Sequence, residues 1–457
     1  MDDHHPHDCT ECISSALDLF KKPQVQLGFE DKRLRVDSPR HAFDLEQPLT
    51  FDISVGSDEY LDTTSLQLFL KLKIVDQANA NLGAAPAAGA NAGVLPDRSI
   101  CFPINNIAST LFKELNVKIH SKLVSKSSNL YAYRCLIEKL LSYSPSVLTS
   151  TAERSGFYLD DADVHQYGPD IKNDDYKANT GAKARFNLSV PSKVFQVCDR
   201  LHADICSSDT FLPPNTKLNL ELIRNNNKFC LMGHTEAAGY KIKILDAYLE
   251  SRVFKIANSV KESHQLSLQH NPYMFMFRQV ELRYHNFQAQ STNLNLVDFY
   301  THNTTPRRVI FGLVAADGFL GNFHMNPAGF ENYKVTQFVL RNDDKIVDRE
   351  LNADYANDLF IEPYNNFLSG SGVLDEANRG TIITKEIFKN SCNLYCFDLT
   401  SFHSAEQDVL DPNKSCKLSV EIKLGEPLPR NVVLICYLEN DSFIKITKDK
   451  EVLFPKE

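Results

Sequence analysis

Residues 65–75 read Ser-Leu-Gln-Leu-Phe-Leu-Lys-Leu-Lys-Ile-Val, and one side of this stretch is wholly apolar. The apolar side consists of every second residue, namely Leu66, Leu68, Leu70, Leu72 and Ile74. Successive side chains of a β-strand point to opposite faces, so a period of two is typical of a strand with one buried face. The stretch therefore predicts a strand that lies over a hydrophobic core.

The same alternation returns in both halves of the chain. It is clear at residues 115–119 and 218–222, and further apolar strands are predicted at 309–314, 335–340, 418–424 and 432–437. The halves also share a weak echo, because Asp204-Ile205 precedes a strand at 217–222 and Asp398-Leu399 precedes one at 417–422. Two successive β halves favour two sandwiches side by side, and a jelly roll is a sandwich that can carry long loops.

Length and composition agree with two β domains. The chain has 457 residues, and a single core seldom serves so many, so two domains of roughly 200 residues are expected. Phe (29) and Tyr (17) are frequent, which favours strands. The net charge of -9 argues against a protein that coats nucleic acid, because neutralising phosphates needs a surplus of Lys and Arg. We expect no strong sequence-specific nucleic-acid binding.

The cysteines and the termini bear on the compartment. The 11 cysteines are dispersed and odd in number, which is typical of buried free thiols in a reducing compartment. The first residues are acidic and His-rich rather than basic and then apolar, and no apolar run is long enough to span a membrane. We expect a protein that is made inside a host cell, is not secreted and does not contact a membrane.

One helix and two long loops are predicted between the strands. The helix is predicted from five apolar residues at helical spacing: Tyr133, Leu136, Ile137, Leu140 and Leu141. The candidates for its N-terminal cap are Ser127, Ser128 and Asn129, and it is expected to end near Pro145. We expect this helix over the edge or end of a sheet. Residues 78–93 are rich in Ala and Gly and predict a flexible surface loop, and residues 151–183 predict a long polar loop.

Residues 1–45 are predicted to form an N-terminal arm. Their apolar residues, Leu17, Leu19 and Phe20, need a partner surface, either a neighbouring subunit or the underside of the same chain. The predicted domains are the arm (1–45), a first jelly roll (46–235, with the flexible loop 78–93) and a second jelly roll with a C-terminal tail (236–457).

The sequence contains no Gly-rich phosphate loop, no His-Glu-x-x-His pair and no Gly-x-Ser-x-Gly elbow, so no catalytic residue is predicted. Three clusters contain residue types that could form binding sites, and each has a simpler interpretation. The soft ligands His4, His5, His7, Cys9 and Cys12 lack a scaffold, and Asp160, Asp161 and Asp163 lack the spacing of a calcium loop. The basic residues Lys241, Lys243, Arg252, Lys255 and Lys261 interleave with apolar ones, as on a solvated strand. We predict no metal site and no cofactor.

A series of short motifs resembles one viral family when the motifs are taken in order. They include Phe102-Pro103-Ile104-Asn105-Asn106, Ser109-Thr110-Leu111-Phe112, Tyr131-Ala132-Tyr133-Arg134, Leu140-Leu141-Ser142-Tyr143, His202-Ala203-Asp204-Ile205, Leu212-Pro213-Pro214-Asn215, Asn326-Pro327 and Phe397-Asp398-Leu399-Thr400. This succession is similar to that of the double jelly-roll major capsid proteins, which are hexon-like, of Polinton/Maverick elements and adintoviruses. It extends over about residues 10–445.

The resemblance implies an all-β double jelly roll: two tandem eight-stranded sandwiches with a few short helices and long loops. It implies a structural protein, not an enzyme, that forms homotrimers and an icosahedral capsid around double-stranded DNA, with a single jelly-roll penton protein as partner. The chain would then reside in the virion. Two alternatives are a domesticated cellular scaffold and a jelly-roll carbohydrate-binding protein. The stretch Leu368-Ser369-Gly370-Ser371-Gly372 also resembles the cleavage pattern of adenovirus-type maturation proteases.

Overall fold

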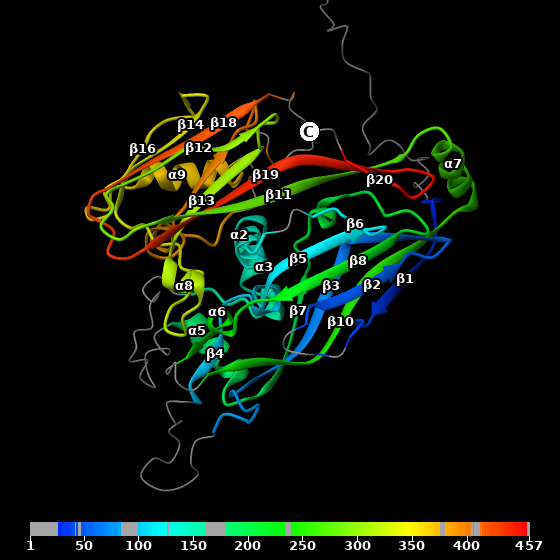
Figure 1. Cartoon of the computed structure of the whole chain (residues 1–457), viewed down its shortest axis with the longest axis horizontal. Coiled ribbons are helices and arrows are strands. Elements are labelled where there is room, and N and C mark those ends of the chain that lie inside the picture. The colour runs from blue at the N-terminus through cyan, green and yellow to red at the C-terminus, as the bar shows by residue number, and fades with distance from the viewer. Residues whose placement is uncertain are drawn as a thin grey trace, which may run out of the picture.

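The computed structural model describes residues 26–41, 43, 47–83, 99–125, 128–160, 179–233, 239–374, 380–403, 405, 412 and 414–454. Its strands form four large sheets and a small one that joins β4 (Cys101–Pro103) to β9 (Leu231–Gly233). Figure 1 shows the four large sheets as two sandwiches that lie side by side.

The first sandwich contains two four-stranded sheets. One has the order β1 (Phe29–Asp37), β10 (Lys241–Ile256), β3 (Glu59–Val75), β7 (Val194–Arg200). The other has the order β2 (Leu49–Ser54), β8 (Lys217–Arg224), β5 (Phe112–Ile119), β6 (Lys122–Leu123). With the eight strands numbered along the chain, the sheets run 1-8-3-6 and 2-7-4-5. This order, with antiparallel pairing throughout, is that of a jelly roll.

The second sandwich repeats this order. One sheet runs β11 (Tyr273–Phe287), β19 (Val432–Ile446), β13 (Arg308–Ala315), β17 (Leu394–Asp398), and β20 (Val452–Leu453) extends it beside β19. The other runs β12 (Asn293–His302), β18 (Cys416–Leu424), β14 (Val335–Asn342), β15 (Lys345–Ile346), with β16 (Leu351–Asn352) beside β14. These strands again give 1-8-3-6 and 2-7-4-5. The expected pair of eight-stranded jelly rolls is therefore confirmed.

Strand pairing corrects both boundaries expected for the first jelly roll. The arm predicted at 1–45 contains β1, the first strand, and the predicted end at residue 235 leaves out β10, the eighth strand, which pairs with β1 and β3. The alternation does not reveal β1, because most of its side chains are exposed on both faces. The two jelly rolls are instead separated by α7 (Asn258–Leu268), between β10 and β11.

The alternating stretches all form strands with one buried face. In β3, the five residues Leu66, Leu68, Leu70, Leu72 and Ile74 are at most 2% exposed. The echo between the halves also has a structural basis, because β8 and β18 are the seventh strands of their jelly rolls. The basic residues of β10 lie mostly on its exposed side, as expected for a solvated strand.

The predicted helix is α2 (Tyr131–Ser142), and its capping was predicted wrongly. Its N-cap is Leu130, which makes no side-chain capping bond, and Pro145 begins the next helix, α3 (Pro145–Leu148). The predicted loop 151–183 also contains helical turns, η3 (Thr151–Ser155) and the start of α5 (Thr180–Ser189). The remaining short helices are α1 (Ile107–Thr110), η4 (Asp204–Ser207), α6 (Asn227–Cys230), α8 (Ala316–Leu320), α9 (Ile361–Gly370) and α10 (Lys385–Asn390).

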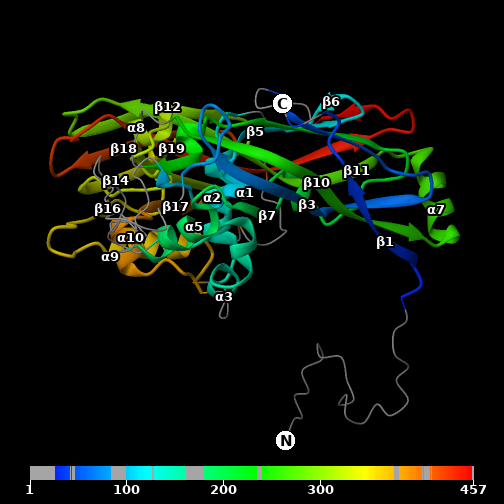
Figure 2. The ribbon, with the colours of Figure 1, turned by 90° about the horizontal axis from the view of Figure 1, so that it is seen from below.

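Helices occupy equivalent connections in the two jelly rolls. α2, α3 and α5 lie between the fifth and sixth strands of the first, and α9 and α10 lie between the fifth and sixth strands of the second. Figure 2 shows α3, α5, α9 and α10 on the same side of the long strands β10 and β11. The insertions of the two jelly rolls therefore project in a common direction.

Several predictions fall outside the described residues. They concern Leu17, Leu19 and Phe20 of the arm, the cluster from His4 to Cys12, Asp161, Asp163, and most of the loop 78–93. In the described part of the chain, no helix is long and apolar enough to cross a membrane.

Candidate functional site

The two jelly rolls meet at a polar joint built around α2, which lies between the two sandwiches in Figure 1. Backbone and hydroxyl hydrogen bonds cross from the first jelly roll to the second. Tyr133 of α2 donates its hydroxyl hydrogen to the carbonyl oxygen of Pro327 (3.0 Å), and the backbone nitrogens of Arg278 and Val280 in β11 donate to Ser207 (3.0 Å) and Asp204 (3.2 Å). The two buried contacts, at Tyr133 and Val280, cost little because each polar group finds a partner.

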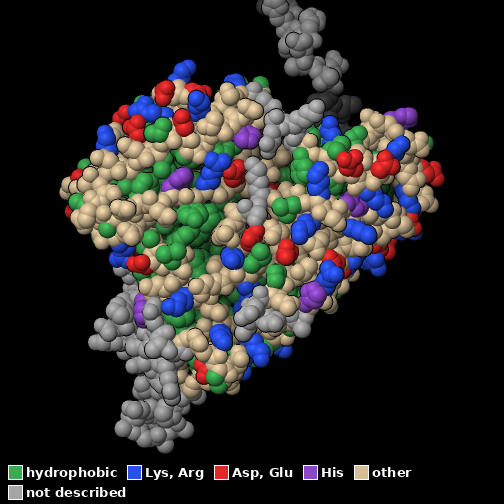
Figure 3. All heavy atoms as spheres, viewed as in Figure 1, with side chains coloured by type: hydrophobic (Ala, Val, Ile, Leu, Met, Phe, Trp, Pro, Cys, Tyr) green, Lys and Arg blue, Asp and Glu red, His purple; other side chains and the backbone are tan. Residues whose placement is uncertain are grey.

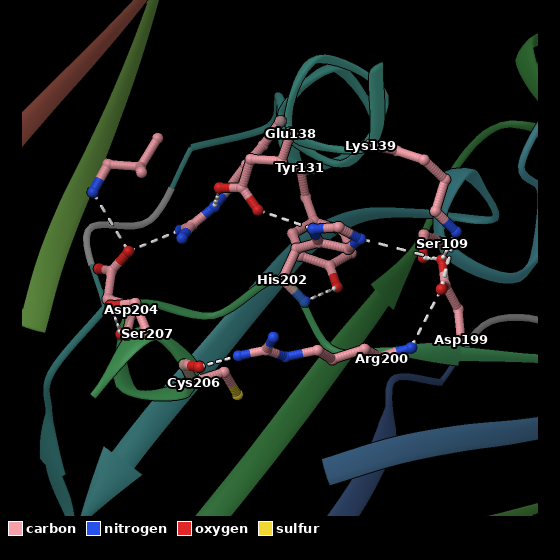
Figure 4. Close-up of polar contacts among 12 residues, drawn as sticks. Ser109, Tyr131, Glu138, Lys139, Asp199, Arg200, His202, Asp204, Cys206 and Ser207 are labelled. Carbon is pink, nitrogen blue, oxygen red and sulfur yellow. Dashed lines mark hydrogen bonds and ion pairs between the residues drawn. The ribbon is translucent and has the colours of Figure 1, made fainter. Parts of the chain in front are cut away.

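A chain of buried charged side chains stands behind these contacts, and we call it the joint network: Arg134, Glu138, Lys139, Asp199, His202 and Asp204. Figure 4 shows Glu138 and Lys139 on α2 approaching Asp199 at the end of β7, His202 after it and Asp204 of η4. Helical spacing places Arg134 and Glu138 on one face of α2, since residues four apart are neighbours there. The network thus links one helix to two segments near residue 200.

Arg134 is at the centre of the half of the network nearest the second jelly roll. Its guanidinium donates to Glu138 (2.7 Å) and to Asp204 (2.6 Å), and Asp204 also accepts the backbone N–H of Val280. Tyr437 of β19 donates to Glu138 at 3.5 Å. Arg134 therefore holds in place both carboxylates that contact the second jelly roll.

Lys139 is at the other end, within the first jelly roll. Its ammonium donates to both carboxylate oxygens of Asp199 (2.8 Å each), to Ser155 (2.8 Å) and to Asn106 (3.0 Å). Asp199 also accepts from the hydroxyl of Ser109 (2.7 Å). The side chains of Lys139 and Asp199 are each only 4% exposed, so this ion pair is fully buried.

His202 lies between the two halves. Its Nδ1 is 2.7 Å from a carboxylate oxygen of Glu138, and its Nε2 faces Asp199 at 3.8 Å. Burial disfavours the charged ring, but the nearby carboxylates of Asp199 and Glu138 outweigh it, so the pKa of His202 lies above its usual value. For Glu138, burial opposes ionisation, but Arg134 and His202 lower its pKa to about 2.

Asp204 has the opposite balance. Burial raises its pKa above the usual value despite the neighbouring guanidinium of Arg134, and one of its oxygens, Oδ2, has no hydrogen-bond partner. Burying a carboxylate with one oxygen unpaired lowers the free energy of unfolding. Asp204 therefore accepts the bond from Val280 but makes the first jelly roll less stable.

A cleft of about 470 Å³ opens beside the joint network. Residues of both jelly rolls line it, among them Arg200, His202, Arg278, Arg308 and Glu439. Burial raises the pKa of the nearby Cys206 thiol to about 11, so this thiol is not a nucleophile at neutral pH. The chemistry available here is ion pairing and hydrogen bonding, which suits a structural joint.

The clusters weighed from the sequence lie elsewhere. Asp160 pairs with Arg185 at 2.8 Å. All nine cysteines in the described ranges are buried and free, Cys392 and Cys396 among them. No group of three or more His, Cys, Asp or Glu that could hold a metal ion occurs in the part of the chain that the structure describes.

Reasoning from the sequence did not single out the joint network as a site. Two of the quoted motifs, Tyr131-Ala132-Tyr133-Arg134 and His202-Ala203-Asp204-Ile205, contain three of its members. The motifs are about 70 residues apart, and Arg134 Nη1 meets Asp204 Oδ1 only in the folded chain. The one available signal was the presence of charged residues inside otherwise apolar motifs.

Comparison with solved structures identifies the fold. A chain of the Sputnik virophage, solved by cryo-EM, matches 98% of this chain over 93% of its own length, with a TM-score of 0.60 and 11% identity. The mavirus major capsid protein matches 98% of this chain over 95% of its own, with a TM-score of 0.53 and 10% identity. The chain has the double jelly-roll fold of viral major capsid proteins.

Other comparisons extend this result. The Faustovirus major capsid protein is a further double jelly-roll neighbour, with a TM-score of 0.53 and 8% identity over 93% of this chain and 92% of its own. The solved neighbours are thus capsid and virus-particle proteins rather than enzymes. An uncharacterized protein of Caenorhabditis elegans, F54H12.2, is 23% identical over 345 residues, which are 75% of this chain and 77% of that protein. No family model matches the sequence.

Proposed function

We propose that this chain is a major capsid protein that assembles as homotrimers into an icosahedral shell around a double-stranded DNA genome. The observation that carries the proposal is the double jelly roll itself, which aligns with the mavirus major capsid protein over 98% of this chain. The motifs quoted from the sequence support a Polinton/Maverick or adintovirus origin, with a single jelly-roll penton protein as the partner in the lattice.

The symmetry of the fold supports the trimer. Each chain has two sandwiches with the same strand order, so three chains around one axis provide six similar units. A closed cyclic contact of this kind fits a hexagonal lattice position. We expect obligate contacts of more than ~2,000 Å² per pair of subunits.

An apolar patch offers one such contact. Figure 3 shows apolar side chains gathered over α8 and the neighbouring part of β11. Tyr284 and Leu320 are 48% and 72% exposed there, and the rings of Tyr284 and Phe319 are 5.1 Å apart. Exposed apolar patches mark interaction sites. A second copy of the chain is the occupant that the proposed trimer requires.

The experiment is light scattering of the purified chain over a range of concentrations, followed by electron microscopy. We expect a trimer or larger particles. A stable monomer near 51.7 kDa under all conditions would contradict the capsid proposal.

The variant Leu320→Asp tests the patch separately and should weaken the trimer at least about tenfold, since ~1.4 kcal/mol of lost contact already gives that factor. The control is Leu266→Asp on α7, at the other end of the molecule (Figure 1), which is 63% exposed. A trimer that survives both substitutions equally would exclude the patch but not the trimer.

A domesticated cellular scaffold is the second candidate. The 23% identity to a nematode protein favours it, because it shows a similar chain in an animal. A scaffold predicts a stable trimer that never forms closed particles, which the same micrographs would reveal.

A further inference from the structure

His202 is held in a position where one ring can satisfy two carboxylates only if it carries two protons. Glu138 lies 2.7 Å from Nδ1, and Asp199 lies 3.8 Å from Nε2, which is buried and has no hydrogen-bond partner. A neutral imidazole has a single N–H and an acceptor lone pair on its other nitrogen. Without the second proton, that lone pair would face a buried carboxylate.

The surroundings of His202 leave no other way to balance these charges. Glu138 of α2 and Asp199 of β7 face the ring directly, and Tyr131 and Arg134 of α2 line the same pocket. Behind them, Lys139 of α2 binds Asp199, Asp204 of η4 binds Arg134, and Tyr437 of β19 binds Glu138. The two cations are already engaged, because Arg134 binds Glu138 and Asp204, and Lys139 binds Asp199, Ser155 and Asn106. The ring of His202 is therefore the group that can place a positive charge between Glu138 and Asp199.

We propose that His202 is a proton-operated latch of the joint, which is closed when the ring is doubly protonated and loosened when it loses a proton. The closed latch fixes Glu138 and, through Arg134, Asp204. These two carboxylates accept from Tyr437 and from the backbone of Val280 in the second jelly roll. The proton on His202 thus controls how firmly the two jelly rolls are held together.

The direction of the pH dependence follows from the shifts. The folded-state pKa of His202 is raised above 6.5, so its contribution to stability is complete below pH 6.5 and is lost as the pH rises through that raised pKa. The pKa of Glu138 is lowered from 4.5 to about 2, so its contribution is complete above pH 4.5 and is lost as the pH falls toward 2. The combined contribution of His202 and Glu138 is largest between about pH 4.5 and pH 6.5, and it falls on the alkaline side through His202.

Amide hydrogen exchange of the full chain, read by mass spectrometry from about pH 6 to about pH 9, tests the latch. After correction for intrinsic exchange, protection of η4 and β11 should fall as the pH rises. Each unit by which the pKa of His202 exceeds 6.5 corresponds to about a tenfold change in the opening equilibrium. Protection of β3, in the core of the first jelly roll, should stay constant.

Variants identify the responsible group. His202→Gln, which cannot be protonated, should be as weakly protected near pH 6 as the native chain is near pH 9, with no further dependence on pH. The matched control is His270→Gln, an exposed histidine after α7, which should behave as the native chain does. Glu138→Gln should shift the loss of protection to lower pH, because one of the charges that hold the proton is removed.

Constant protection of η4 and β11 in the native chain across this range would refute the latch, and so would the same pH dependence in His202→Gln. If His202→Gln does not fold, the native profile and Glu138→Gln still decide the question. Within the proposed function, the latch would make shells less stable in alkali. The exchange experiment reads contacts within one chain, so failure to assemble would count against the capsid proposal without affecting this test.

Discussion

Replacing Lys139 with Met tests how much the buried end of the joint network contributes to stability. The substitution removes the cation that binds both oxygens of Asp199 and keeps a side chain of similar length. Removing one partner of a buried ion pair costs about 3–5 kcal/mol, because the other charge is left buried. Here Asp199 would keep the Ser109 hydroxyl and the backbone N–H of Arg200 as donors. We therefore expect the lower end, about 3 kcal/mol.

The assay is unfolding followed by circular dichroism at neutral pH. For a unit of roughly 200 residues, a loss of about 3 kcal/mol lowers the melting temperature by roughly 6–12 °C. The control is Lys118→Met, whose pair with Glu221 spans 3.5 Å between side chains that are 39% and 28% exposed. Such surface pairs contribute about 0–1 kcal/mol.

Adding Asp199→Asn to Lys139→Met should recover part of the loss, because a neutral amide costs less to bury than an unpaired carboxylate. If Lys139→Met lowered the melting temperature as little as Lys118→Met does, the reasoning would be refuted. The buried charge of Asp199 would then be stabilised well enough without its lysine. A double variant no more stable than Lys139→Met would do the same.

Two further predictions concern the second jelly roll. Gly312→Ala should destabilise the chain by about 1–3 kcal/mol in urea unfolding, because a Cβ in β13 would overlap Phe330 and Leu394. An unchanged urea midpoint of unfolding would contradict this, since it would mean that these two side chains move aside without loss of stability. The folded chain should resist a maturation-type protease at Leu368–Gly372, because Ser371 is fully buried and the carbonyl of Gly370 accepts from Arg308 (2.9 Å). Two fragments that separate near Ser371 under native conditions would contradict this expectation.

The strands were predictable because their signal is local. In β3, β5 and β8 the alternating residues carry the information, since the period of two is a property of the strand itself. The helix α2 was predictable for the same reason, from its period of about 3.6 residues. Its cap was not, because the N-cap residue Leu130 has no side-chain acceptor and is a buried core residue.

The domain boundaries needed the tertiary structure. In β1, Phe-Glu-Asp-Lys-Arg-Leu-Arg-Val-Asp, only Leu34 and Val36 alternate with polar residues, and both are more than half exposed, so the pattern is too short to predict a strand. It becomes a strand by pairing with β10, more than 200 residues later in the chain. Pairing over such a separation depends on backbone hydrogen bonds, which all residue types make, and so leaves little trace in the sequence.

The class of this protein could be read from local patterns in the chain: two β-sandwiches, no visible catalytic motif, and an ordered set of motifs similar to those of double jelly-roll capsid proteins. Where the charges of those motifs meet depends on the packing of the two jelly rolls. Arg134, Glu138 and His202 become one network only because α2 is packed between the jelly rolls, beside the end of β7. Ion pairs depend on distances of a few ångströms between groups, and only the folded chain sets those distances.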